Sequence, residues 1–179
     1  MKIKFYLFTL IIFLQIQINA QDSLKYTGSS LSVADAKIIL NHHNTVRATK
    51  GSPPLEWDTA IAGYAQEWAN YLVDKNHNNI DHRFTLGKNI KPYGENLFWG
   101  SDFNYYTVLD ASKAWYDEKE IYVYEPVSNT NFHESGHYSQ MMWNTTKQMG
   151  VGIAKGTDGS IIVVANYFPA GNIIGMLPY

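Results

Sequence analysis

Apolar side chains recur every three or four positions in the first half of the chain, and this spacing predicts two helices. The first is predicted over residues 33–49, because Ser32 followed by Asp35 forms a capping-box-like start. The second is predicted over residues 58–76, with Asp58 as its N-terminal cap. The inward positions are Ala36, Ile39, Leu40, His43 and Arg47 in the first helix, and Ile61, Ala65, Trp68 and Leu72 in the second.

A third apolar stripe predicts a helix from about Thr107 to Tyr122 and includes a carboxylate. Glu118 falls on the same stripe as Val108, Ala111 and Trp115. Since burial of an unpaired charge is costly, Glu118 should either have a partner or lie in water where the helix frays. The partner would be a cation, a proton-sharing carboxyl or a metal. The residues by themselves leave both alternatives open.

The remaining apolar runs predict strands. Residues 93–100 form a short extended segment after a polar, turn-rich stretch over residues 76–91 that we interpret as a loop. Residues 149–154 and 160–168 are β-rich and flank a loop that contains glycine, so they predict an antiparallel hairpin. A short helix is predicted after His137. Helices first and a hairpin last favour an α+β fold over a parallel βαβ sheet.

The N-terminus follows a different pattern. Lys2 and Lys4 precede a strongly apolar run from Phe5 to Leu14, and the small residue Ala20 closes the segment. This order is typical of a secretory signal peptide over residues 1–20. A membrane anchor is the alternative, but polar residues interrupt the run before it reaches the roughly 20 apolar residues that a span needs. We therefore expect cleavage after Ala20.

Beyond that segment we expect a leader over residues 21–30 and one soluble domain over residues 31–179, long enough to bury a core. No later segment is apolar enough over sufficient length to span a bilayer. The predicted location is extracellular, or periplasmic if the chain comes from a Gram-negative bacterium. We expect a monomer.

Composition narrows the possible functions. Of 179 residues, 45% are hydrophobic and 17% are charged, which excludes a disordered chain. A net charge of -2 provides no positive field for a phosphate backbone, so no nucleic acid partner is expected. The chain has no cysteine, which excludes disulfides, a thiol nucleophile and thiolate metal ligands. Any metal must be bound by His, Asp or Glu.

Two histidine patterns in the sequence each allow a metal-binding and a non-ligand interpretation. Residues 133–137 spell H-E-x-x-H, the zinc-protease signature, which needs two His one turn apart on a continuous helix. Gly136 is a poor helix former, and we interpret this match as accidental. His43 lies on an apolar stripe, and we interpret it as a hydrogen-bonded core residue rather than a ligand.

An aromatic cluster lies before the third helix. It is either a lipid-contacting surface or part of the core packing. Aromatic side chains next to a helix start are more often packed, so we favour the second interpretation. Its members are Phe98, Trp99, Phe103, Tyr105 and Tyr106.

Residues 136–146 match a known signature without departure: G-H-Y-S-Q-M-M-W-N-T-T fits G-H-[YF]-[TS]-Q-x-x-W-x-x-[ST]. Residues 162–172 resemble a hydrophobic strand followed by C-N-Y-x-P-x-G-N, with Ala165 in place of the cysteine. On these motifs the chain resembles the CAP superfamily, the group of cysteine-rich secretory proteins, antigen 5 and pathogenesis-related 1 proteins, also called SCP domains. Further pieces appear in the expected order over about residues 31–179: His43-Asn44 with Arg47, Leu55-Glu56-Trp57, Ala65 to Ala69, Tyr93-Gly94-Glu95-Asn96-Leu97, and Ala114-Trp115 with Glu118.

The resemblance implies an α-β-α sandwich, with helices on both faces of a small antiparallel sheet, and a cleft lined by two His and two Glu. On this chain the four residues would be His82, Glu95, Glu118 and His137, with His77 as the alternative to His82. Such a set can bind a divalent cation such as zinc through His82 and His137, while the glutamates order water or the imidazoles. It can also act as a general acid/base pair.

The resemblance also bears on function, because the family is described as secreted binding, toxin, defence or lipid-carrier proteins without a common reaction. We therefore predict a secreted, non-enzymatic module that binds an extracellular ligand or partner, with lipids and sterols among the candidate ligands. A metal-dependent hydrolase using the same cleft and a purely structural exported module are the alternatives. Ser135 and Ser139 are near His137 along the chain, but adjacency is not the geometry of a catalytic triad.

Overall fold

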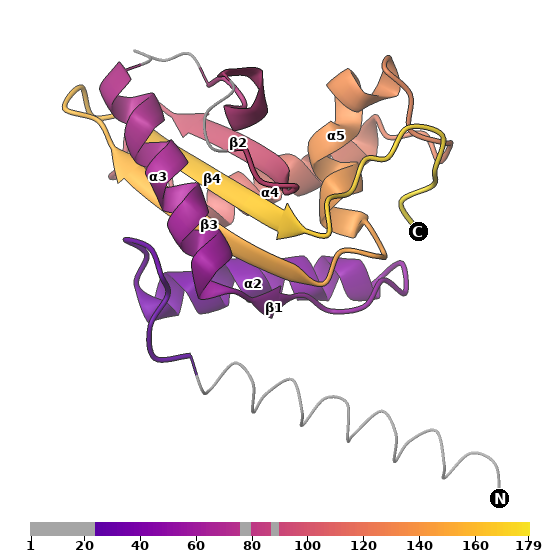
Figure 1. Cartoon of the computed structure of the whole chain (residues 1–179), viewed down its shortest axis with the longest axis horizontal. Coiled ribbons are helices and arrows are strands. Elements are labelled where there is room, and N and C mark those ends of the chain that lie inside the picture. The colour runs from indigo at the N-terminus through magenta and orange to yellow at the C-terminus, as the bar shows by residue number, and fades with distance from the viewer. Residues whose placement is uncertain (1–23, 76–79, 87–89) are drawn as a thin grey trace, which may run out of the picture.

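The computed structural model describes residues 24–75, 80–86 and 90–179; the predicted signal peptide over residues 1–20 and His77 lie outside the described residues. The elements in chain order are α2 (Val33–Ala48), β1 (Glu56–Trp57), α3 (Thr59–Lys75), η1 (Arg83–Leu86), β2 (Gly94–Gly100), α4 (Val108–Asp117), η2 (Glu118–Glu120), α5 (Asn131–Met142), β3 (Gln148–Lys155) and β4 (Ile161–Phe168). In Figure 1, α3 crosses in front of β3 and β4, and α4 lies behind them. The α-β-α sandwich and the α+β class are confirmed.

The two amphipathic helices form where the apolar spacing places them. α2 follows Ser32, whose side chain accepts the N–H of Asp35 (3.0 Å). α3 follows Asp58, whose carboxylate accepts the N–H groups of Ala60 (2.8 Å) and Ile61 (2.9 Å). Every inward position expected on these helices is buried. The helical period and the caps were therefore predicted correctly.

The third helix is shorter than predicted. α4 begins with a capping box between Thr107 and Asp110, but it ends at Asp117 and continues only as the 3-10 turn η2. Glu118 is the C-cap of α4 and not a member of its interior stripe. The predicted end at Tyr122 is thus wrong. α4 ends early, and hydrogen bonds with α5 satisfy the Glu118 carboxylate at that end of the helix.

α5 begins earlier than the short helix predicted after His137. It starts at Asn131 and contains a break at Ser135, where φ is -143° and ψ is 28°. Two helical segments therefore meet at Ser135, and only the second matches the predicted helix.

The sheet has the strand order β1-β3-β4-β2. β3 and β4 form the predicted antiparallel hairpin, and β2 pairs antiparallel with β4. β1 pairs parallel with β3 through Glu56↔Gln148 and Trp57↔Met149, so the sheet is mixed rather than purely antiparallel as expected. A strand of two residues has no alternation of apolar positions, which is why the sequence did not indicate it.

The central hairpin builds a core on each face of the sheet. Val151, Val163 and Ala165 pack with α2, α4 and α5, whereas Ile162 and Val164 pack with α3. Because β4 is buried on both faces, its sequence from Ile161 to Ala165 is a continuous apolar run. Ala165, which replaces the cysteine of the motif, is completely buried. Within the described residues, no helix has the length and apolar character needed to cross a membrane.

Candidate functional site

His137 and Glu118 form a pair between α5 and the end of α4. His137 Nδ1 lies 2.5 Å from Glu118 Oε1, and the N–H of Tyr138 donates to Glu118 Oε2 (3.0 Å). Because the helix restarts after Ser135, Tyr138 lies in the first turn of a helical segment, where free N–H groups favour a carboxylate. Of the two alternatives for Glu118, the structure supports the partnered carboxylate.

His82 and Glu95 form a second pair between η1 and β2. His82 Nδ1 lies 2.9 Å from Glu95 Oε1, and the N–H of Arg83 donates to the same oxygen (3.0 Å). Asn166 on β4 donates through Nδ2 to Glu95 Oε2 (3.2 Å). The Glu95 side chain is 5% exposed and that of His82 is 28% exposed. A buried carboxylate thus holds an imidazole that solvent can reach.

β2 links the two pairs. Glu95 contacts His82, and the next residue, Asn96, donates through Nδ2 to the main-chain oxygen of His137 (3.1 Å). Consecutive residues of one strand therefore position the segments that carry both histidines. The four predicted site residues come together as two His–Glu pairs attached to the same strand.

The hydrogen bonds define which imidazole nitrogen carries the proton. A carboxylate only accepts, so Nδ1 is the donor in both His82 and His137. In a neutral ring the lone pair is then on Nε2. This is the tautomer that a neighbouring carboxylate fixes in histidines that bind a metal.

The donor set limits how a metal would be held. Within the part of the chain that the structure describes, no three His, Asp or Glu side chains converge into a group that could hold a metal. A cation between the two pairs would therefore be held by His82 and His137 and would complete its coordination with solvent or a ligand. Such an open arrangement differs from a structural zinc site, which has four protein ligands.

The H-E-x-x-H match does not form the helix that a zinc protease needs. The non-helical residue Ser135 lies inside the motif. His133 and Glu134 are exposed, whereas His137 contacts Glu118. The interpretation of this match as accidental agrees with the structure.

His43 is a buried core residue, as predicted. Its Nδ1 lies 2.9 Å from the Ile39 carbonyl oxygen and its Nε2 lies 2.9 Å from the Tyr167 hydroxyl. Since the carbonyl only accepts, Nδ1 carries the proton and Nε2 accepts the hydroxyl proton of Tyr167. Tyr167 in turn accepts from Asn96 Nδ2 (3.3 Å), so this polar chain reaches the residue that holds the His137 carbonyl.

Residues 40–167 match the CAP family, described as the cysteine-rich secretory protein family. The chain is 37% identical over 141 residues to pathogenesis-related protein 1C of Nicotiana tabacum, covering 78% of each chain. It is 35% identical over 141 residues to pathogenesis-related protein PRMS of Zea mays, covering 78% of this chain and 80% of that protein. The chain belongs to the CAP family.

A solved CAP structure has the same architecture. The crystal structure of NaASP2 with Zn2+ superimposes with a TM-score of 0.69 at 25% identity, covering 83% of this chain and 86% of that chain. The resemblance stated from the motifs is therefore confirmed for family and fold.

Three polar residues that shape the site of this CAP domain were not singled out from the sequence. Asn96 and Asn166 lie within the family motifs, and a polar residue in an apolar strand was the signal that could have identified them. Arg83 follows His82 in a polar stretch, and no local pattern indicates that its side chain is buried.

The aromatic cluster before α4 divides into two parts. Phe98, Phe103 and Tyr106 pack against the core formed with α2, α4 and α5, in agreement with the packing interpretation. Trp99 and Tyr105 are exposed, by 38% and 75%. Contact of this CAP domain with lipid remains a prediction.

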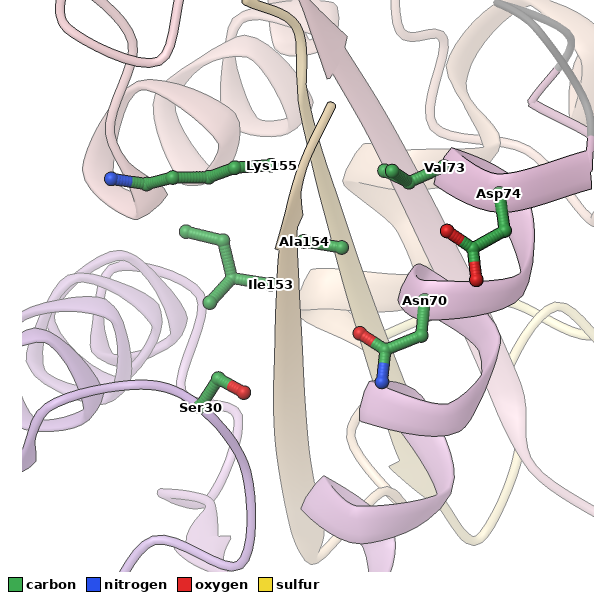
Figure 2. Close-up of a pocket in the computed structure, with 7 residues that line it drawn as sticks. All are labelled: Ser30, Asn70, Val73, Asp74, Ile153, Ala154 and Lys155. Atoms are coloured by element: carbon green, nitrogen blue, oxygen red, sulfur yellow. The ribbon is translucent and has the colours of Figure 1, made fainter. Parts of the chain in front are cut away.

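A separate hollow lies between α3 and β3 (Figure 2). Its volume is about 480 Å³, and none of His82, Glu95, Glu118 and His137 lines it. The residues around it are Ser30, Asn70, Val73, Asp74, Ile153, Ala154 and Lys155. The paired histidines of the CAP domain are therefore not part of this hollow.

Proposed function

We propose that the protein is an exported, non-enzymatic binding module in which His82, Glu95, Glu118 and His137 line one cleft that holds a divalent cation. The observation that carries this proposal is that each imidazole is held through Nδ1 by a glutamate. In that tautomer Nε2 carries the lone pair that a metal ion binds, and carboxylate-supported histidines are common in metal sites. A bound cation would supply a Lewis acid that attracts an oxygen-bearing ligand.

The comparisons support zinc as the first cation to test and export as the context. NaASP2, at 25% identity, was crystallised with Zn2+. The matching family is described as secretory, and the apolar N-terminal run after Lys2 and Lys4 is typical of a signal peptide. We propose His82 rather than His77 as the first histidine, because His82 contacts Glu95.

We propose an extracellular ligand and would screen lipids and sterols first. Exposed Trp99 and Tyr105 offer aromatic surface that a lipid can contact. Organic extraction of purified protein followed by mass spectrometry tests this part of the proposal. Enrichment of one lipid class over a Trp99→Ala, Tyr105→Ala control would support it, and an extract without lipid would count against it.

A zinc titration tests the cation site directly. Zinc should raise the melting temperature by mass action on the folded state, and the double variant His82→Ala, His137→Ala should lose this rise. His133→Ala is the matched control and should keep it, because His133 lies outside the pairs. Since a metal binds the deprotonated nitrogen of imidazole, protons compete with zinc, and the rise should weaken at lower pH. A rise that persists in the double variant would refute the site.

A metal-dependent hydrolase is the alternative, because a histidine held by a glutamate can also serve as a general acid or base. Ser139 does not favour a serine mechanism, since its Oγ lies 2.6 Å from Asn172 Oδ1 and 3.2 Å from the Gly136 oxygen. A panel of peptides, esters and glycans distinguishes the functions. Turnover lost in Glu118→Gln would establish the hydrolase, whereas zinc binding without turnover would support the binding module. If the protein shows neither turnover nor zinc binding, the purely structural exported module is the function that remains.

A further inference from the structure

The segment that carries His82 is attached to α3 on both sides of the histidine. Trp68 donates through Nε1 to the main-chain oxygen of Asp81 (3.0 Å). Arg83 donates through Nη1 to the main-chain oxygen of Tyr64 (2.9 Å). The two residues that flank His82 in the chain are therefore both connected to the same face of α3, one turn apart.

The Arg83 side chain makes three kinds of contact with α3. Its side chain is 6% exposed, and its Cζ lies 3.7 Å from the centroid of the Tyr64 ring. Its Nη2 donates to Glu67 Oε2 (3.0 Å), whose side chain is 69% exposed. A planar guanidinium can stack on a ring and donate hydrogen bonds in its own plane at once. A lysine ammonium cannot reproduce this combination.

The main chain of Arg83 connects the same segment to β2. Its N–H donates to Glu95 Oε1 (3.0 Å), the oxygen that also contacts His82 Nδ1 (2.9 Å). Arg83 thus binds α3 through its side chain and Glu95 through its backbone. The location of the His82 ring relative to β2 depends on both attachments.

We propose that Arg83 is a positioning residue that sets the location of the His82 imidazole by holding its segment between α3 and Glu95. The expected consequence is weaker metal binding when the Arg83 side chain is altered, and this consequence rests on the proposed cation cleft. The contact with Tyr64 is the main determinant, because the Glu67 carboxylate is largely in solvent and an exposed ion pair contributes little.

The test compares Arg83→Lys with Glu67→Gln as the matched control. Arg83→Lys keeps the charge but loses the stacking and the fork of donors, whereas Glu67→Gln removes only the exposed ion pair. By isothermal titration with zinc chloride, Arg83→Lys should weaken binding about 10- to 100-fold, the range seen when support of a metal-binding histidine is lost. Glu67→Gln should change the affinity less than about threefold.

A second measurement needs no metal. The 15N–1H correlation spectrum of the imidazoles reports the tautomer and the Nδ1 hydrogen bond of each histidine separately. In metal-free Arg83→Lys, the His82 signals should shift toward a mixed tautomer, while those of His137, which is held by Glu118 and Asn96, should stay in place. A role of Arg83 in stability alone would not alter His82 selectively.

The outcomes separate this inference from the proposed function. Unchanged His82 signals and unchanged zinc affinity in folded Arg83→Lys would overturn it, as would equal shifts of His82 and His137. If Arg83→Lys does not fold, Tyr64→Leu, which removes the ring but keeps the guanidinium, decides by the same readouts. If the unmodified protein binds no zinc, the cation cleft fails, and the metal-free spectra still decide the role of Arg83.

Discussion

Arg47 illustrates how a buried charge is accommodated in this molecule. Its guanidinium donates to the main-chain oxygens of Pro53 (2.8 Å), Met141 (2.7 Å), Trp143 (3.0 Å) and Thr146 (3.1 Å). Burial lowers the pKa of Arg47 to about 10, so the group remains charged at neutral pH. The charge is thus stabilised by carbonyl dipoles, and one side chain connects α2 to the segment between α5 and β3.

His43 provides a residue-level prediction about pH. Burial lowers its pKa to about 3 in the folded protein, against 6.5 for an ordinary histidine. Between these values the unfolded chain binds a proton that the folded chain does not. The contribution of His43 to stability is therefore complete above pH 6.5 and is lost as the pH falls, by up to about 1.4 kcal/mol per pH unit.

Urea unfolding between pH 7.5 and 5.5 measures this effect, because carboxyl groups of ordinary pKa stay ionised in that range. The free energy of unfolding should fall more steeply with decreasing pH in the unmodified protein than in His43→Gln. Parallel pH profiles for the two proteins would show that His43 is not the titrating group.

At the scale of elements, α3 approaches β3 unusually closely. A Cβ on Gly152 would lie 2.3 Å from the backbone nitrogen of Gln66, so only glycine fits there. The approach brings the Gln66 side chain to β3, where it donates to the Ile153 oxygen (2.7 Å) and accepts the Ile153 N–H (3.1 Å). Gln66 pairs with β3 beyond Met149, where the pairing with β1 ends, and so covers an open strand edge.

This packing predicts opposite effects for two glycine substitutions. Gly152→Ala should destabilise the protein by about 1–3 kcal/mol, because the backbone of α3 must move to admit the methyl group. Gly63→Ala is the matched control on α3. Its Cβ would approach only the Gly28 oxygen at 3.4 Å, and alanine gains up to about 1 kcal/mol of helix propensity. Thermal and urea unfolding of both variants test the packing. Equal stabilities of Gly152→Ala and Gly63→Ala would show that α3 does not approach β3 this closely.

At the scale of the whole molecule, the two cores share the same central strands. Trp115 lies in the core with α2, α4 and α5, and Trp68 lies in the core with α3. Because β4 contributes alternate side chains to both cores, loss of one core removes the support of the other. The chain has no disulfide to hold either part separately.

We therefore expect a single cooperative unfolding transition. The sequence has five tryptophans, so the test uses a background in which Trp57, Trp99 and Trp143 are replaced by Phe. In that background Trp115→Phe leaves Trp68 as the core probe under α3, and Trp68→Phe leaves Trp115 on the opposite side. In each variant, the urea midpoint from tryptophan fluorescence should coincide with the midpoint from far-UV circular dichroism. A fluorescence midpoint displaced from the circular dichroism midpoint in either variant would show that the two layers unfold independently.

The sequence by itself determined the features that depend on local spacing. α2 and α3 were predicted because a buried face imposes a period of 3.6 on nearby residues. The β3–β4 hairpin was predicted because two β-rich runs flank a loop that contains glycine. The motifs around Gly136 and Asn166 also indicated the family. The resemblance assigned Glu95, Glu118 and His137, and left His82 preferred over His77. These features depend only on neighbours in the chain or on the order of residue types along it.

The tertiary structure decided which groups meet. His82 and Glu95 are 13 residues apart and His137 and Glu118 are 19 apart, so no local period specifies their contacts. The early end of α4, the parallel strand β1 and the burial of Arg83 were likewise not predicted. In each case a hydrogen bond or a ring contact to a distant element outweighs local preference, because a buried polar group must find a partner wherever the fold provides one.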